Sequence, residues 1–207
     1  MLLIYTVVAG FLMEVPRLPI LNESIRSLYF HVPMWFTMVL LLMGSLFFSI
    51  KYLMNKKEYF DILSREFTTT ALFFGVLGLV TGMVWGTFTW GEPWSGDPRQ
   101  NSSAICLLMY LGLFLLRNSI ADDVQRARIG SVYTIFAFTL MVVLLFVYPR
   151  MVDSLHPGAG GNPGFNTYDL DNRLRWVFYP AVMGWAMLGI WISLLKVRMA
   201  KLLLSDE

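Results

Sequence analysis

The chain has 207 residues, of which 57% are hydrophobic and 14% are charged, and its mean hydropathy is +0.60. A typical soluble domain has about 25% charged residues, so this composition excludes an ordinary soluble domain and indicates an integral membrane protein with one domain over residues 1–207. The net charge of +2 gives no indication of a nucleic-acid partner, and the single cysteine, Cys106, excludes an internal disulfide, a CxxC pair and a CxxCH heme-attachment site.

Six apolar segments follow one another along the chain, and they predict an all-α protein with a bundle of six transmembrane helices. A helix needs about 20 residues to cross the hydrocarbon core, so the third, fourth and fifth segments span it only if their polar ends enter the interface. The first segment is short, and because it lacks a basic n-region and an A-x-A site we expect it to remain as a helix. The segments are Met1–Met13, Pro33–Leu53, Thr69–Trp85, Ser103–Leu116, Gly130–Tyr148 and Val177–Lys196.

The distribution of basic residues predicts the orientation of this bundle. Cytoplasmic loops carry an excess of Lys and Arg, which makes the more basic side cytoplasmic, with both termini on it. The outer loops are then 14–32, 86–102 and 149–176. The basic side has ten such residues, Lys51, Lys56, Lys57, Arg65, Arg117, Arg126, Arg128, Lys196, Arg198 and Lys201, and the other side has six, Arg17, Arg26, Arg99, Arg150, Arg173 and Arg175.

Both histidines of the chain, His31 and His156, lie on the outer side. His31 precedes Pro33 at the start of a predicted helix, where it could simply bond to a loop carbonyl. His156 begins a stretch rich in glycine and proline that could be a surface turn. As a pair, two neutral imidazoles without a thiolate suit the two axial positions of a heme iron. A zinc site is less favoured, because it would also need carboxylates such as Asp153 or Glu92.

Between the two histidines in the chain lies WGTFTWGEPWSGDPR, residues 85–99, which has three tryptophans. Trp belts at membrane interfaces are common and need no ligand. The glycines and the Asp-Pro-Arg sequence instead suit a shelf on which Trp85, Trp90 and Trp94 hold a flat apolar ligand. Arg99 would bind a carboxylate at its rim, and Asp97 could orient that arginine.

Three other features are interpreted as structural. Gly75, Gly78, Gly82 and Gly86 share one helix face and predict close helix packing. We expect Arg117–Arg128 to be a solvated cytoplasmic loop and Cys106 to be a packing residue.

The motif Trp90-Gly91-x-x-Trp94-x-x-Asp97-Pro98-Arg99, preceded by Trp85-Gly86, resembles the tryptophan-rich WWD signature of heme-handling proteins in cytochrome c biogenesis. The sequence YFHVP before the second helix and SLH before the last resemble the CcmC branch of that superfamily. The resemblance implies a CcmC/CcsA-like cytochrome c assembly domain in the bacterial inner membrane. It also implies a site for heme b at the periplasmic face, with His31 and His156 at the iron and Trp85, Trp90, Trp94, Asp97 and Arg99 forming its platform.

The resemblance further implies transport of heme, not enzymatic catalysis. Heme would be handed to a CcmE-type chaperone, with a CcmA/CcmB-type ABC transporter, a CcmD-type small subunit and membrane lipid as partners. One alternative is a CcsA-type component of a complex that delivers heme and ligates it to apocytochrome, although such proteins generally have more membrane helices. The other is a heme-free structural subunit whose Trp-rich loop docks a partner.

Overall fold

A computed structural model describes residues 1–16, 21–156 and 170–205 of the chain. Within these ranges all regular secondary structure is helical, which confirms the predicted all-α class. The elements are α1 (Leu2–Leu12), the 3-10 helix η1 (Asn22–Tyr29), α2 (His31–Asn55), α3 (Glu58–Trp90), α4 (Pro98–Asn118), α5 (Asp123–Val142), the π-helical segment η2 (Val143–Val147), α6 (Tyr148–Met151) and α7 (Asn172–Ser205).

Each of the six predicted segments corresponds to a helix, but most of the helices extend well beyond the apolar run. α3 begins at Glu58 instead of Thr69 and ends at Trp90 instead of Trp85, because polar residues at an interface still satisfy their backbone groups by continuing the helix. Segments α5, η2 and α6 form one continuous helix over Asp123–Met151. Its π-helical turn precedes Pro149, which lacks the N–H needed for the regular bond to the carbonyl four residues earlier.

Four helical stretches of the described chain are long and apolar enough to cross a membrane: Asn22–Asn55, Glu58–Trp90, Asp123–Met151 and Asn172–Leu203. α1 has 11 residues and is therefore only about 16 Å long at about 1.5 Å per residue. α4 has 21 residues, but it opens with the polar run Arg99–Ser103. Membrane crossing by α1 and α4, and hence a count of six spans, stays a prediction.

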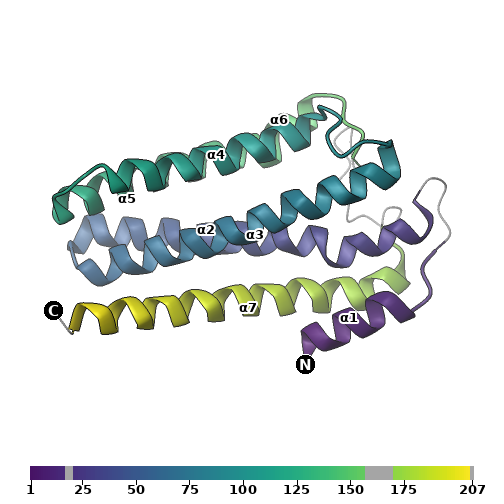
Figure 1. Ribbon diagram of the computed structural model, residues 1–207, viewed down its shortest axis with the longest axis horizontal. Coiled ribbons are helices and arrows are strands. Elements are labelled where there is room, and N and C mark those ends of the chain that lie inside the picture. The colour runs from purple at the N-terminus through teal and green to yellow at the C-terminus, as the bar shows by residue number, and fades with distance from the viewer. Residues whose placement is uncertain (17–20, 157–169, 206–207) are drawn as a thin grey trace.

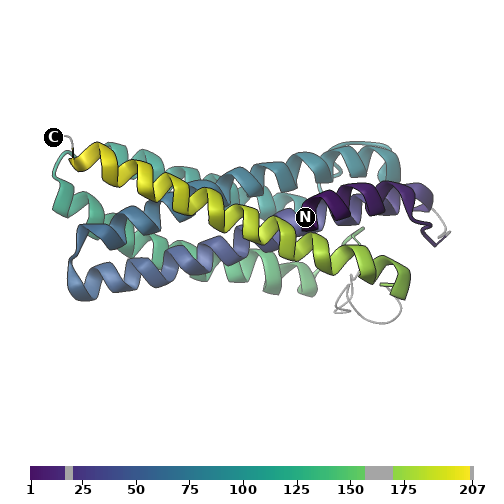
Figure 2. The same cartoon turned by 90° about the horizontal axis from the view of Figure 1, so that it is seen from below.

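The helices form three layers along a common long axis (Figure 1). α4 and the α5–α6 helix lie on one side, α2 and α3 in the middle, and α7 with α1 on the other side. α7 crosses the middle layer obliquely when the bundle is turned (Figure 2). The α2–α3 and α4–α5 connections lie at the same end of the bundle as the C-terminus, and the α3–α4 connection lies at the opposite end. This arrangement gathers the predicted cytoplasmic loops at one end and the tryptophan-rich loop at the other.

α1 is fixed to α7 at a place where α7 contains a proline. Pro180 cannot donate to the carbonyl of Trp176, and this carbonyl instead accepts a hydrogen bond from the Tyr5 hydroxyl, at 3.2 Å. The first residues of α1 pack beside Gly184. The N-terminus therefore lies beside the middle of α7 (Figure 1), so a cytoplasmic location for both termini stays a prediction.

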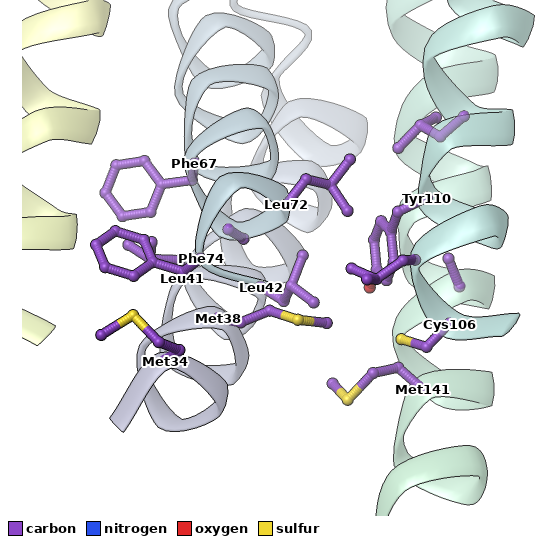
Figure 3. Packing of buried hydrophobic residues seen from close by; sticks show 14 of the residues in the cluster. Met34, Met38, Leu41, Leu42, Phe67, Leu72, Phe74, Cys106, Tyr110 and Met141 are labelled. Atoms are coloured by element: carbon purple, nitrogen blue, oxygen red, sulfur yellow. The ribbon is translucent and has the colours of Figure 1, made fainter. Parts of the chain in front are cut away.

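The core packs α2 and α3 against α4, α5 and α7 (Figure 3). Close approach depends on glycine, because a Cβ on Gly75 would lie 2.6 Å from the sulfur of Met38. Toward the C-terminal end, the Ser45 hydroxyl bonds to the Ser64 hydroxyl at 2.9 Å and to that of Thr68 at 2.6 Å. Cys106 is fully buried in this core, as its prediction as a packing residue requires.

We predict that Glu92, in the loop before α4, and Asn118, the last residue of α4, are on opposite sides of the membrane. Both are exposed, whereas Cys106, the native cysteine, is 0% exposed and should not react. A membrane-impermeant thiol reagent added to intact cells should therefore label Glu92→Cys but not Asn118→Cys until the membrane is opened. If Asn118→Cys alone is labelled in intact cells, the protein has the opposite orientation and the prediction is wrong.

Candidate functional site

The tryptophan-rich stretch is shorter as a loop than predicted, because α3 continues to Trp90 and α4 begins at Pro98. Gly91 and Gly96, at φ of +86° and +71°, take the left-handed conformations that let the chain turn between the two helices. Trp85 is buried in the last turns of α3, and Trp94 is 38% exposed in the loop. The indoles of Trp85 and Trp90 meet edge to face at 73°, so they do not form one flat shelf in this structure.

Asp97 connects this loop to the segment that follows α6. Its side chain is fully buried and caps α4 by accepting a bond from the amide of Arg99 at 2.8 Å. The same carboxylate accepts from the Leu155 amide at 2.7 Å, from the Ser154 hydroxyl at 2.9 Å and from Nδ1 of His156 at 2.9 Å. Sequence reasoning made Asp97 a possible partner of Arg99, and the two side chains do interact electrostatically. The sequence did not predict the bonds of this carboxylate to the His156 ring and to the backbone amide of Arg99.

Electrostatics favour an ionised Asp97 beside a neutral His156. Burial would raise the pKa of the Asp97 carboxyl, but the hydrogen bonds from the Leu155 and Arg99 amides and the nearby His156 hold that pKa below its usual value. Burial lowers the pKa of His156, although Asp97 opposes this shift. At pH 7 the imidazole of His156 is therefore uncharged, as a metal ligand must be.

The His156 ring also contacts two of the predicted tryptophans. Its centroid lies 4.7 Å from that of Trp90, at an interplanar angle of 68°, and 6.2 Å from that of Trp85. Two indoles from the end of α3 therefore flank an imidazole held by Asp97 at the start of α4. The predicted stiffening of this loop by Pro157 and Pro163 falls on residues outside the described ranges.

His31 starts α2, as predicted, and its ring lies against the glycine face of α3. Nδ1 is 2.9 Å from the carbonyl oxygen of Gly78 and 3.2 Å from the hydroxyl of Thr81. A Cβ on Gly82 would lie 2.7 Å from Cε1 of the ring, so only glycine leaves room for it in this position. The glycine face thus does provide close packing, and it also positions a histidine.

Hydrogen bonding sets the same tautomer for both histidines. Nδ1 of His31 faces a carbonyl and Nδ1 of His156 faces a carboxylate, and both of these groups only accept, so Nδ1 carries the proton in each ring. Nε2 keeps its lone pair in each case and has no hydrogen-bond partner among the described residues. His31 packs against Gly82 and His156 lies beside Trp85, so both rings lie next to the last turns of α3. Each ring can therefore offer one neutral nitrogen donor, and a second partner fixes its orientation.

The described part of the chain has no group of three or more His, Cys, Asp and Glu side chains that could hold a metal ion.

Several positioning residues were not identified from the sequence. Ser154 was quoted within the SLH motif but given no role, and Thr81 was treated only as part of a helix. Gly82 was predicted to allow close helix packing, but not to position His31. Gln100 was also missed: its amide accepts from Ser95 and donates to the Pro93 carbonyl at 3.1 Å, tying the loop to α4. The available signal was a polar residue in the first turn of an apolar helix directly after a glycine-containing loop.

The chain is similar to several known proteins. A family model described as CcmC, Heme exporter protein C, matches residues 1–206. Heme exporter protein C of Bradyrhizobium diazoefficiens is 29% identical over 126 residues, 60% of this chain and 48% of that protein. Heme exporter protein C of Paracoccus denitrificans is 22% identical over 179 residues, 86% of this chain and 73% of that protein. A cytochrome c biogenesis protein CcsA of Prochlorococcus marinus is 35% identical over 79 residues, 38% of this chain and 25% of that protein. The aligned region spans about half the length of the Bradyrhizobium relative.

Proposed function

Because the chain belongs to the heme exporter protein C family, we propose that it is a membrane component of cytochrome c biogenesis that binds heme as cargo. The heme is heme b, held at the outer face of the bacterial cytoplasmic membrane between His31 and His156. The observation that carries the proposal is the matched pair of imidazoles, each with its Nδ1 fixed and its Nε2 available.

Each predicted site residue has a role in this proposal. His31 and His156 donate Nε2 to the iron, and Trp85, Trp90 and Trp94 contact the apolar ring. Arg99 binds a propionate, as a guanidinium does through paired hydrogen bonds. Asp97 positions His156 instead of contacting heme.

Release requires that the bonds from Nε2 of His31 and His156 to the iron dissociate. This chain makes and breaks no covalent bond of the heme itself, so its proposed role is transport and not catalysis. We propose that the heme is handed to a CcmE-type chaperone. A CcmA/CcmB-type ABC transporter and a CcmD-type small subunit would complete the assembly.

Replacing the histidines tests the proposal. The purified wild-type protein is expected to show a low-spin, six-coordinate heme spectrum, because two imidazoles are strong axial ligands. His31→Ala and His156→Ala should each give a five-coordinate spectrum that added imidazole restores. If neither variant changes the spectrum or the heme content, each histidine serves only its own hydrogen bond. A wild-type protein without any heme absorption would support the structural-subunit alternative, and co-purification with apocytochrome instead of a heme chaperone would support the CcsA-type alternative.

Gly82→Ala is expected to reproduce the spectrum of His31→Ala without removing any ligand atom. The added methyl group would take the place of the His31 ring and move its Nε2 away from the iron. Gly112→Ala is the matched control, because the atom nearest to its new Cβ is a tyrosine hydroxyl at 3.2 Å in a different part of the bundle. The absorption spectrum and heme content measure both variants. An unaltered spectrum for Gly82→Ala would contradict the placement of His31 at the iron.

A further inference from the structure

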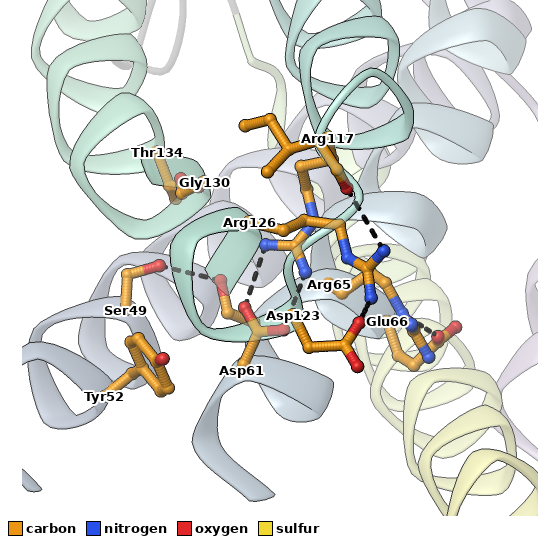
Figure 4. Close-up of polar contacts among 12 residues, drawn as sticks. Ser49, Tyr52, Asp61, Arg65, Glu66, Arg117, Asp123, Arg126, Gly130 and Thr134 are labelled. Atoms are coloured by element: carbon orange, nitrogen blue, oxygen red, sulfur yellow. Dashed lines mark hydrogen bonds and ion pairs between the residues drawn. The ribbon is translucent and has the colours of Figure 1, made fainter. Parts of the chain in front are cut away.

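At the end of the bundle remote from the histidines, the structure contains a cavity of about 600 Å³ with charged and apolar walls. Tyr52, near the end of α2, lines it, whereas His31 starts the same helix. Its charged lining comprises five basic residues, Lys56, Arg65, Arg117, Arg126 and Lys196, and four acidic ones, Glu58, Asp61, Glu66 and Asp123. Figure 4 labels Asp61, Arg65, Glu66, Arg117, Asp123 and Arg126 among them.

The basic residues are not equally available to a ligand. Arg117 forms a bidentate salt bridge with Asp61, with Nη1–Oδ1 and Nη2–Oδ2 distances of 2.8 and 2.6 Å. The Arg117 side chain is only 8% exposed. Arg126 pairs with Asp123 and also donates to a backbone carbonyl. The guanidinium groups of Arg117 and Arg126 are therefore already bonded within the protein, where they connect the ends of helices.

Arg65 and Lys196 differ from these two because they share a single carboxylate. Glu66 accepts from Nε of Arg65 at 2.9 Å and contacts Nζ of Lys196 at 3.1 Å. Glu66 is 12% exposed beneath them, while the side chains of Arg65 and Lys196 are 42% and 34% exposed. The Nη groups of Arg65 have no hydrogen bond among the described residues, and Lys56 has no ion pair there. A buried anion thus fixes two cations from different helices side by side, with donors left over.

Apolar residues form the rest of the lining and continue onto the outer surface of the bundle. Val124, Met199 and Leu203 line the cavity and are 62–69% exposed. A small water-soluble anion needs no such surface, whereas a phospholipid needs cations for its phosphate and apolar contacts for its glycerol and acyl chains. Anionic lipids are the lipids that basic pockets between membrane helices recognise on the cytoplasmic side.

We infer that this cavity binds the phosphate headgroup of an anionic phospholipid, with Arg65, Lys196 and Lys56 as its cationic contacts. Guanidinium and ammonium groups together suit a phosphodiester, since the first bonds to two oxygens and the second acts as a point charge. The site is independent of the heme site, and it would anchor the ends of α2, α3 and α7 at the predicted cytoplasmic surface.

Native mass spectrometry of the full chain in a neutral detergent tests the inference, using phosphatidylglycerol against phosphatidylcholine. Wild-type protein should retain phosphatidylglycerol preferentially. Lys56→Gln removes a cation without leaving a partner unpaired, and it should weaken phosphatidylglycerol binding about fivefold. Lys57→Gln is its control, because Lys57 is the neighbouring lysine, is exposed and does not line the cavity.

Arg65→Gln combined with Lys196→Gln should weaken binding about 25-fold on the same scale. The charge-matched control is Arg128→Gln with Arg198→Gln, two exposed residues outside the cavity. Equal effects of cavity and control variants would overturn the inference, and so would equal binding of the two lipids. A third arm uses inorganic phosphate: if it binds in a Lys56-dependent manner while phosphatidylglycerol does not, the ligand is a free anion and the lipid assignment is wrong.

Discussion

Asp97→Ala is expected to lower heme retention about 10- to 100-fold while leaving the chain inserted in the membrane. This is the range in which the loss of a second partner of a metal-bound histidine lowers metal affinity. Asp97 holds Nδ1 of His156 and, through the Leu155 amide and the Ser154 hydroxyl, also holds the backbone that carries this histidine. Its loss should therefore produce the spectrum of His156→Ala, including restoration by imidazole.

Two controls separate this positioning role from the capping of α4. Asparagine is as good an N-cap as aspartate, so Asp97→Asn should keep the stability of the bundle while still weakening heme retention, because the charged acceptor of His156 is gone. Asp153→Ala removes a nearby exposed carboxylate and should leave the heme spectrum unchanged. Measured heme content and midpoints of thermal unfolding decide between the roles. If Asp97→Ala and Asp153→Ala retain equal heme, Asp97 is only a helix cap.

Composition, apolar segments and the WWD-like motif were sufficient to predict the helical class and the family. The structure confirms the class, and the family model confirms the family. Composition is a sum over all residues, and apolar segments and motifs each lie within a short stretch of the chain, so they can be read without knowing which distant residues meet. The positions of His31 and His156 at the same end of the bundle also followed from the sequence, because apolar segments of similar length place alternate loops at opposite ends.

Contacts between residues that lie far apart in the chain could not be predicted from the sequence. The Asp97–His156 bond joins residues 59 positions apart, and nothing in the spacing distinguishes it from a bond to neighbouring Arg99. The ends of α3 and α4 were misplaced for a related reason, because polar and aromatic residues past an apolar run can belong equally to a loop or to a helix. Trp90 therefore lies in a helix instead of in the predicted loop.

Arg117 shows the same limit most clearly, since the expectation of a solvated loop at Arg117–Arg128 is wrong. Arg117 ends α4 with 7% of its surface exposed, and α5 has already begun at Asp123. Its guanidinium pairs with Asp61, 56 positions earlier, and lies over Gly130 of α5, where a Cβ would collide with it (Figure 4). A basic residue near a helix end indicates orientation from sequence alone, but its burial depends on a carboxylate and a glycine from two other helices.

Arg117→Met is accordingly expected to destabilise the bundle by about 3–5 kcal/mol, the cost of leaving one member of a buried ion pair without its partner. The Asp61 side chain, 12% exposed beside Arg117, would lose both of its hydrogen bonds to the guanidinium. The free energy of unfolding, measured by titrating detergent-solubilised protein with SDS, reports this loss. Arg128→Met, at an exposed position outside the pair, serves as the control and should change stability by less than about 0.5 kcal/mol.

Replacing both members of the pair distinguishes an unpaired charge from a simple loss of packing. Asp61→Leu with Arg117→Met removes the stranded carboxylate, and such apolar replacements of buried ion pairs are often neutral or stabilising. The double variant should therefore recover most of the stability lost in Arg117→Met, giving a favourable coupling energy between the two substitutions. Additive losses in the double variant would mean that Arg117 contributes through its contacts with Gly130 and the α4–α5 connection, and that its charge is not what binds α3 to α4 at this end of the bundle.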